Sequence, residues 1–221
     1  MNQNVFSKVD HYSRELLNHT ASQLYEIEKT MDSLGIPDMS VSPNQGQFLH
    51  ILAKAINAKR ILEIGTFGAY SAIYLAKALP EDGKLISLEI DPFYAEIAKS
   101  NITKAGLSHK IEIMLGPALL SLIKLSGEKN PSFDMIFLDA DKPNYPNYLD
   151  WIMKLCKPGT LIISDNVVRE GEVIDPDTAD EKVRGVRKFI QGLSQENRLT
   201  STIIQTVSVK GYDGMAISIA G

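Results

Sequence analysis

The chain has 221 residues, of which 44% are hydrophobic and 23% charged, and these values are typical of a folded globular protein. Its formal net charge of -4 at pH 7 lacks the basic excess that binds polyphosphate backbones, so a nucleic-acid partner is disfavoured. A single cysteine, no signal-peptide-like stretch in residues 1–14 and no membrane-length apolar run favour a cytoplasmic protein without a membrane partner. We expect one domain, spanning residues 1–221.

The chain begins with helical patterns. Apolar residues recur at three-to-four spacing between Leu16 and Met31, until Gly35 ends the pattern. The pair Ser42-Pro43 marks the start of another helix, because serine caps helix ends and proline is tolerated in the first turn. These patterns predict a helical cover over residues 1–58.

Short apolar runs that alternate with helical patterns follow from residue 59 onward. Runs that are apolar at successive positions fit strands covered on both faces, as a parallel sheet between two helical layers requires. The expected parallel strands are Arg60 to Ile64, Lys84 to Leu88, Ile111 to Leu115, Asp134 to Leu138 and Thr160 to Ile163.

The end of the chain has a different pattern. The β-rich runs Thr202 to Val209 and Met215 to Ile219 are separated by Lys210 to Gly214, with no helix between them, which predicts an antiparallel hairpin. The fold class is therefore α/β: a Rossmann-like, doubly wound, mostly parallel seven-stranded sheet over residues 59–221, with a C-terminal hairpin and an N-terminal helical cover.

A glycine-containing turn follows the first predicted strand. Gly65 and Gly68 allow close approach of a ligand to backbone amides, but their spacing lacks the G-x-G-x-x-G of a dinucleotide site, and an ordinary tight turn is the alternative. Glu89 lies where an acidic residue would accept hydrogen bonds from a ribose diol, which predicts a nucleoside-bearing cofactor. Glu63 would be awkward beside a pyrophosphate but suits an ammonium and a sulfonium. This favours S-adenosylmethionine over NAD.

Acidic and amide side chains follow the fourth and fifth predicted strands. Asp139 ends the fourth strand, while Asp165 and Asn166 end the fifth, so the three share the edge where ligands bind in open α/β sheets. Their oxygen ligands suit a hard divalent cation, Mg²⁺ foremost with Ca²⁺ or Mn²⁺ as alternatives, and loop caps are the competing interpretation. Lys142, three residues past Asp139, can deprotonate a substrate hydroxyl, although a solvated surface lysine is the alternative.

Five motifs are distributed over almost the whole chain: Ser42 to Leu49, Leu62 to Thr66, Gly116 to Leu119, Phe137 to Lys142 and Ser164 to Asn166. In order and spacing together they resemble the cation-dependent class I O-methyltransferases typified by caffeoyl-coenzyme A O-methyltransferase, with catechol O-methyltransferase a more distant relative. The loop Val167 to Val173 lacks the tryptophan of the plant pattern, so coenzyme A esters do not follow as acceptors.

The resemblance implies methyl transfer from S-adenosylmethionine to a catechol-like hydroxyl of a small aromatic molecule, by a homodimer. It implies a divalent cation held by Asp139, Asp165 and Asn166, with Lys142 and Asp139 as catalytic residues. The implied cofactor contacts are Val41, Glu63, Gly65, Thr66, Ser71, Glu89, Ala118 and Asp141.

Three alternatives stay open at this point. A tRNA hydroxyuridine O-methyltransferase would use the same scaffold, and the acidic balance counts only mildly against it. An NAD-dependent dehydrogenase is disfavoured by the glycine spacing and by Glu63, and a non-catalytic S-adenosylmethionine-binding module is disfavoured by Lys142 and the acidic set.

Overall fold

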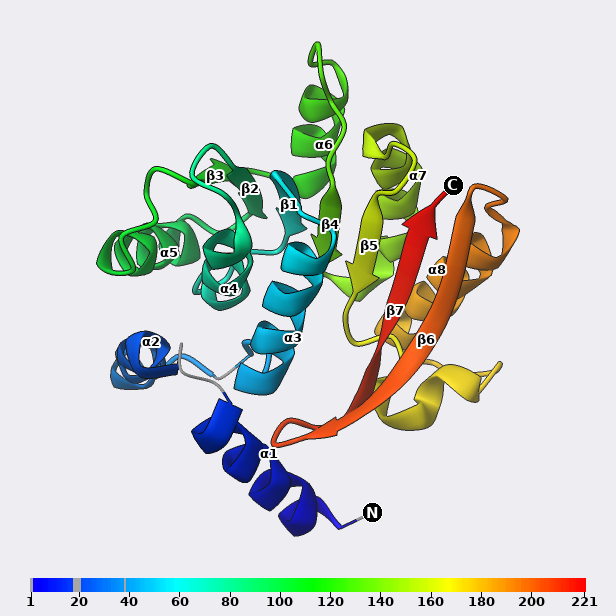
Figure 1. The fold of residues 1–221 in the computed structure, drawn as a ribbon. Helices are drawn as coiled ribbons and strands as arrows, with labels where there is room; N and C mark the ends of the chain where they lie inside the picture. Colours follow the sequence, from blue (N-terminus) through cyan, green and yellow to red (C-terminus); the bar gives the residue numbers. More distant parts are fainter. Residues whose placement is uncertain (1, 18–20, 38) are drawn as a thin grey trace.

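The computed structural model describes residues 2–17, 21–37 and 39–221 (Figure 1). In this part of the chain seven strands form one sheet, in the order β3-β2-β1-β4-β5-β7-β6. The strands are β1 (Arg60–Ile64), β2 (Lys84–Glu89), β3 (Ile111–Leu115), β4 (Met135–Leu138), β5 (Leu161–Ser164), β6 (Leu199–Ser208) and β7 (Gly211–Ala220). Strands β1 to β5 pair in parallel, while β7 pairs antiparallel with both β5 and β6.

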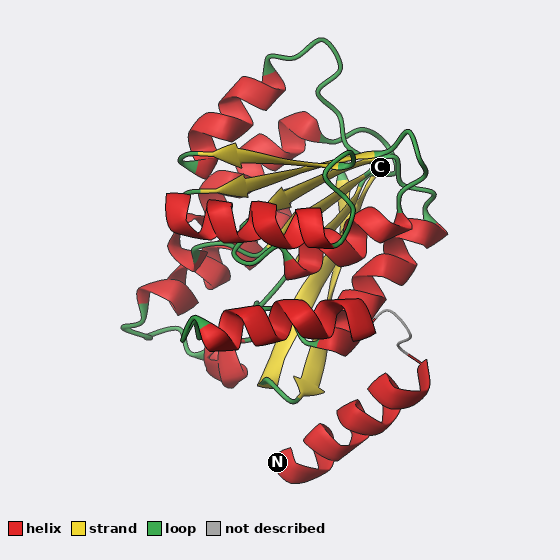
Figure 2. Ribbon diagram, turned by 90° about the vertical axis from the view of Figure 1, so that its left-hand side faces the viewer, coloured by secondary structure: helices red, strands yellow, loops and turns green. Residues whose placement is uncertain are grey.

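Helices cover both faces of the sheet, as Figure 2 shows. On one face lie α2 (Ala21–Ser33), α3 (Pro43–Ala55), α4 (Tyr70–Ala78) and α5 (Pro92–Lys104). On the other face lie α6 (Ala118–Ser126), α7 (Tyr145–Leu155) and α8 (Glu181–Gln195). The short 3-10 helices η1 (Lys142–Asn144) and η2 (Arg169–Ile174) follow β4 and β5. The predicted doubly wound α/β fold is confirmed.

The two hydrophobic cores follow from the alternation of side chains along each strand. In β1, Ile61 belongs to the same buried cluster as Ile73 of α4 on one face, whereas Leu62 belongs to the cluster of Phe189 of α8 on the other, and all four side chains are fully buried. Burial of each such side chain contributes about 1.5–3 kcal/mol. A strand covered on both faces therefore has to be apolar at successive positions, which explains the predicted runs.

The C-terminal hairpin differs from its prediction at the turn. The structure has a two-residue turn, Val209-Lys210, and β7 already begins at Gly211, so the expected connection from Lys210 to Gly214 is wrong. Gly214 lies within β7, where the lack of a side chain allows close packing. A Cβ there would lie 2.5 Å from Val168 Cγ2. Glycines that permit close packing inside a strand resemble a turn in the sequence.

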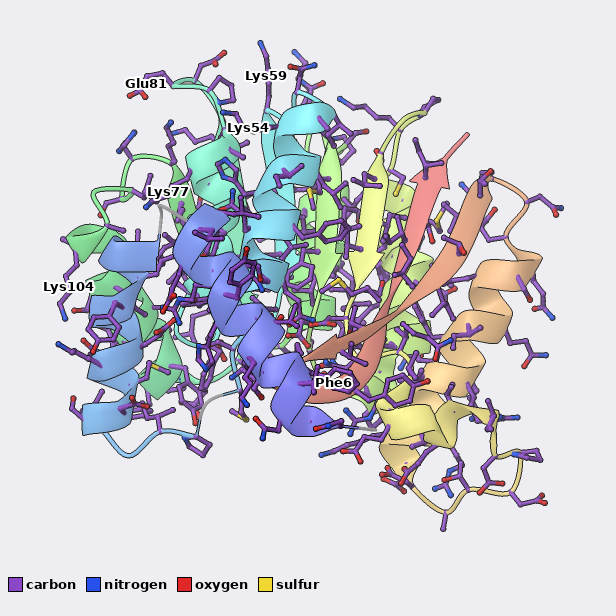
Figure 3. All side chains as sticks on the ribbon, turned by 60° about the horizontal axis from the view of Figure 1, so that its bottom comes forward. Phe6, Lys54, Lys59, Lys77, Glu81 and Lys104 are labelled. Carbon is purple, nitrogen blue, oxygen red and sulfur yellow. The ribbon has the colours of Figure 1, made fainter. Side chains whose placement is uncertain are left out.

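The predicted N-terminal cover consists of α1 (Gln3–Leu17), α2 and α3, and residues 18–20 between α1 and α2 are outside the described part of the chain. Helix α1 has no buried residue, and Leu16 is 54% exposed although it belongs to the predicted apolar pattern. Hydrogen bonds hold α1 to the hairpin turn: Gln3 donates to the Ser208 carbonyl, and Val209 N donates to Asp10. Figure 3 shows Phe6 of α1 beside the end of this hairpin. None of the described helices is both long and apolar enough to span a membrane.

Candidate active site

The carboxyl ends of β1, β4 and β5 lie side by side at the candidate site. The backbone amides of Asp139 and Asp165 still bond to the neighbouring strands, at 2.9 Å each, so the sheet aligns both residues at one edge. The edge is on the side of the sheet where α1 and the hairpin turn lie (Figure 1). The strand order reverses between β1 and β4, and ligands bind at such switch points in open α/β sheets.

Gly65 brings the glycine turn into contact with the acidic residues. Its φ of +102° is strained for any residue with a side chain, and a Cβ would lie 2.0 Å from the Asp139 carbonyl oxygen. Close approach of β1 to β4 at this point therefore requires glycine. The predicted cofactor turn and the predicted metal-binding residues belong to one site.

A buried polar network lies behind the glycine turn. Glu63 is fully buried, and its carboxyl group accepts hydrogen bonds from the hydroxyls of Ser71, at 2.6 Å, and Ser87. Thr66 Oγ1 lies 2.6 Å from the Ser87 hydroxyl. Burial raises the pKa of Glu63 to about 8, against the lowering effect of the two serines. Three predicted cofactor residues thus form one network, with Ser87 as a member that the sequence did not indicate.

The raised pKa of Glu63 makes stability depend on pH. Between its ordinary pKa of 4.5 and about 8, the folded protein keeps a proton that the unfolded chain has lost. The free energy of unfolding should therefore fall as pH rises through this range, by up to about 1.4 kcal/mol per pH unit from this group. Urea unfolding at pH 5 to 8 should show this slope in the wild type and a shallower one in Glu63→Gln; equal slopes would contradict the prediction.

Other predicted cofactor residues line the same edge. Glu89 is 7% exposed, and its carboxylate accepts from Phe67 N at 2.7 Å and from the amides of Ile90 and Asp91. Glu89 thereby fixes the glycine turn against the end of β2. Ala118 opens α6 directly after β3.

The remaining two predicted cofactor residues lie at helix starts. Val41 is buried and precedes Ser42, whose side chain caps α3 in a reciprocal pair with Gln45. Asp141 is exposed and accepts hydrogen bonds from Tyr148 and Asn144. A cavity of about 170 Å³ lies between the cover and the glycine turn, and its lining includes Arg14, Glu28, Val41, Phe67 and Tyr70.

Lys142 is buried next to Asp139. Its side chain lies in the first turn of η1 and only 7% of the residue is exposed. The ammonium donates to Asp139 Oδ1 at 2.8 Å and to the hydroxyl of Tyr145 at 2.7 Å. The alternative of a solvated surface lysine is therefore wrong, because the lysine is desolvated and paired in the acidic cluster that Asp139 and Asp165 form.

The predicted metal-binding residues follow β4 and β5, where Asp139 and Asp165 are close enough to interact electrostatically. Asp165 is 2% exposed, and burial, followed by the negative charge of Asp139, raises its pKa above the ordinary value. Asn166 directly follows in a left-handed conformation, with φ of 56°. The buried carboxyl group of Asp165, the nearby carboxylate of Asp139 and an amide side chain in the next residue are a donor set that suits a hard cation. Within the described residues no three His, Cys, Asp or Glu side chains gather as a metal site, so the set depends on the amide of Asn166.

Asp213 is a member of this region that sequence reasoning missed. Its Oδ1 accepts hydrogen bonds from the backbone amides of Val168, Arg169 and Gly214, each at 2.9 Å. The negative charge of Asp213 also contributes to the raised pKa of Asp165. Asp213 holds the loop after Asn166 in place. The sequence does not indicate this role, because Asp213 lies in the segment predicted as the hairpin connection.

Gly185 of α8 packs directly against the backbone of Lys142. A Cβ at Gly185 would lie 2.2 Å from the Lys142 carbonyl oxygen and 2.7 Å from Pro143 Cα. Backbone atoms cannot yield as the end of a side chain can. Gly185→Ala should therefore displace Lys142, lower kcat by about tenfold or more and cost about 1–3 kcal/mol of stability.

Gly192→Ala on the same helix is the matched control. A Cβ there would meet only Leu149 Cδ2, at 2.8 Å, which is the far end of a flexible side chain. Alanine also favours a helix interior over glycine by about 1 kcal/mol, so this variant should keep its activity and stability. Steady-state kinetics and urea unfolding compare the two, and equal effects would contradict the role of Gly185.

Fold and site together define a doubly wound α/β enzyme whose polar residues gather at the carboxyl ends of β1, β4 and β5. A family model described as O-methyltransferase matches residues 13–218, and the chain belongs to this family. The chain is 46% identical to a catechol O-methyltransferase from Niastella koreensis over 219 residues, which is 99% of each protein. It is 39% identical to a catechol O-methyltransferase from Mycobacterium tuberculosis over 188 residues, 85% of this chain and 84% of that protein.

Solved structures of similar proteins agree with this membership. The O-methyltransferase from Bacillus cereus, solved in complex with SAH, is 43% identical, with a TM-score of 0.96 over 99% of this chain and 100% of that one. The O-methyltransferase TomG from Streptomyces achromogenes, solved with SAM, is also 43% identical, with a TM-score of 0.95 over 100% and 99% of the two chains. The family expected from the sequence motifs is confirmed.

Proposed function

We propose that this O-methyltransferase transfers the methyl group of S-adenosylmethionine to one of two adjacent hydroxyls on a small aromatic acceptor, in the presence of a divalent cation. The observation that carries the proposal is the buried Lys142, which is paired with Asp139 beside Asp165. A base and a hard-cation site next to a glycine turn are the parts that hydroxyl methylation needs.

Two observations support S-adenosylmethionine as the methyl donor. The glycine turn around Gly65 lacks dinucleotide spacing, and Glu63 and Glu89 supply acidic groups at its two sides. The similar proteins from Bacillus cereus and Streptomyces achromogenes were solved with SAH and SAM. We infer that Val41, Glu63, Gly65, Thr66, Ser71, Glu89, Ala118 and Asp141 form the donor site.

Asp139, Asp165 and Asn166 would hold the cation. A divalent cation, Mg²⁺ foremost, lowers the pKa of a hydroxyl that it binds and stabilises negative charge on the oxygen. Asp165 and Asp139 supply two negative charges for it, and Asp213 keeps the loop after Asn166 in position.

Lys142, as the neutral amine, would take the proton from the acceptor hydroxyl and become an ammonium. Its nitrogen is held at 2.8 Å from Asp139, so the base has a fixed position at the end of β4. Loss of the proton leaves an oxygen lone pair that attacks the methyl carbon, the carbon–sulfur bond breaks, and S-adenosylhomocysteine is released. A buried site favours this step, because attack of an anion on a sulfonium removes both charges.

The proposed acceptor class is inferred from the names of the similar proteins. The relatives from Niastella koreensis and Mycobacterium tuberculosis are named catechol O-methyltransferases, and catechol carries the two adjacent hydroxyls of the proposal. An assay of a panel of catechols, flavonoids, caffeoyl esters and tRNA with S-adenosylmethionine and Mg²⁺ tests this. Methylation of small catechols is expected; transfer to tRNA alone, or binding of NADH in place of S-adenosylhomocysteine, would contradict it.

Homodimerisation is also part of the proposal. Most of β6, the edge strand, is exposed, and Phe48 of α3 lines a cavity of about 370 Å³ together with Ile204 and Val207. Exposed apolar side chains beside an unpaired strand edge suit contact with a second copy. Sedimentation should give twice the mass of one chain, and a monomer at micromolar concentration would argue against a dimer.

A further inference from the structure

Tyr145 contacts the groups that surround the base, although the proposed reaction gives it no role. The residue begins α7 and is fully buried. Its hydroxyl lies 2.7 Å from Lys142 Nζ, 3.0 Å from the Asp165 carbonyl oxygen and 3.2 Å from the Leu138 carbonyl oxygen. One oxygen atom thus joins the base to the ends of both β4 and β5.

The direction of these hydrogen bonds is fixed by the partners. A carbonyl oxygen only accepts, so the single hydrogen of the Tyr145 hydroxyl is donated to the carbonyls of Asp165 and Leu138. The hydroxyl oxygen therefore accepts from Lys142. The aromatic ring adds a second contact, because the Lys142 nitrogen lies 4.7 Å from its centroid.

The contacts of Lys142 leave one direction open. A lysine nitrogen has three positions besides its own carbon chain. Asp139 occupies one at 2.8 Å and Tyr145 occupies another at 2.7 Å. In the neutral amine that the proposed reaction requires, these two contacts take the two hydrogens of the nitrogen, and its lone pair is left for the acceptor hydroxyl.

We propose that Tyr145 is a positioning residue, whose hydroxyl fixes the direction of the Lys142 nitrogen toward the acceptor and aligns it with the end of β5. The inference rests on the proposed function, in which Lys142 is the base. Without the hydroxyl, Lys142 would keep its ion pair with Asp139 but could rotate about it. Misplacement of a reacting group lowers the rate of the chemical step more than it weakens binding of the substrates.

Tyr145→Phe is the variant that tests this inference. Phenylalanine keeps the ring that packs on Phe189, whose centroid lies 5.3 Å away, and removes only the hydroxyl. In methyl transfer to a catechol with Mg²⁺, kcat should fall by about 10- to 100-fold while both KM values stay within about threefold. The affinity for S-adenosylhomocysteine, measured by calorimetry, should be unchanged. An unchanged kcat, or a loss confined to KM, would overturn the inference.

A double-mutant cycle separates positioning from a general structural defect. If Tyr145 acts through Lys142, Tyr145→Phe should have no further effect on kcat in a Lys142→Met background. Additive losses in the double variant would mean that Tyr145 supports the fold alone, and would overturn the inference. Failure of the proposed function is distinguishable, because Lys142→Met itself would then keep the wild-type rate.

Discussion

Asp139→Asn should reduce methyl transfer to a catechol by on the order of 10³-fold, because about 4 kcal/mol of transition-state stabilisation depends on the cation and the paired base. The substitution keeps the shape of the side chain but removes the negative charge that faces Lys142 at 2.8 Å and Asp165. Initial rates at saturating S-adenosylmethionine and Mg²⁺ measure the loss. The affinity for Mn²⁺, followed by electron paramagnetic resonance, should fall with it.

Two controls accompany this variant. Asp150→Asn changes an exposed aspartate on α7 and should keep the wild-type rate. Binding of S-adenosylhomocysteine to Asp139→Asn should stay within about tenfold of the wild type, because the donor site is formed mainly by other residues. Wild-type turnover by Asp139→Asn would contradict the role of Asp139 in the cation site.

Lys142→Met should lower kcat by about 10² to 10⁴-fold, the range typical of losing a general base. Methionine can fill the buried space, so the loss reports on the amino group and not on packing. The KM for the acceptor should change far less than kcat, and the pH dependence of kcat should change as well, because the group that receives the proton is gone.

Lys154→Met is the matched control for this prediction. Lys154 is exposed on α7, where its ammonium lies 3.5 Å from the centroid of the Trp151 ring, away from the acidic cluster. Its substitution should leave kcat unchanged. An unchanged rate in Lys142→Met, or an unchanged pH–rate profile, would exclude Lys142 as the base.

The parallel strands could be predicted because their burial is visible in the sequence. A strand between two helical layers has to be apolar at successive positions, as in Met135 to Leu138, and each of the five predicted parallel strands lies within one residue of its position in the structure. Strand ends at a switch point then place Asp139 and Asp165 together without further information.

Contacts between distant segments could not be predicted in this way. Gly185 and Asp213 reach the site from α8 and from β7, and neither has a local pattern that distinguishes it from an ordinary helix or turn residue. Tyr145 does have a weak signal, since it lies three residues past Lys142, but the hydroxyl's bonds to two strand ends depend on the assembled sheet. The roles of Gly185, Asp213 and Tyr145 depend on contacts between segments that are distant in the sequence.

The dependence of methyl transfer on a divalent cation tests the central proposal most directly. Protein stripped with chelator should have background activity toward a catechol with S-adenosylmethionine, and the rate should return to a saturating value as Mg²⁺ is added. The same titration of Asp165→Asn should need far more Mg²⁺ or give no recovery, because Asp165 would hold the cation. Full activity of the wild type in excess chelator would contradict the account.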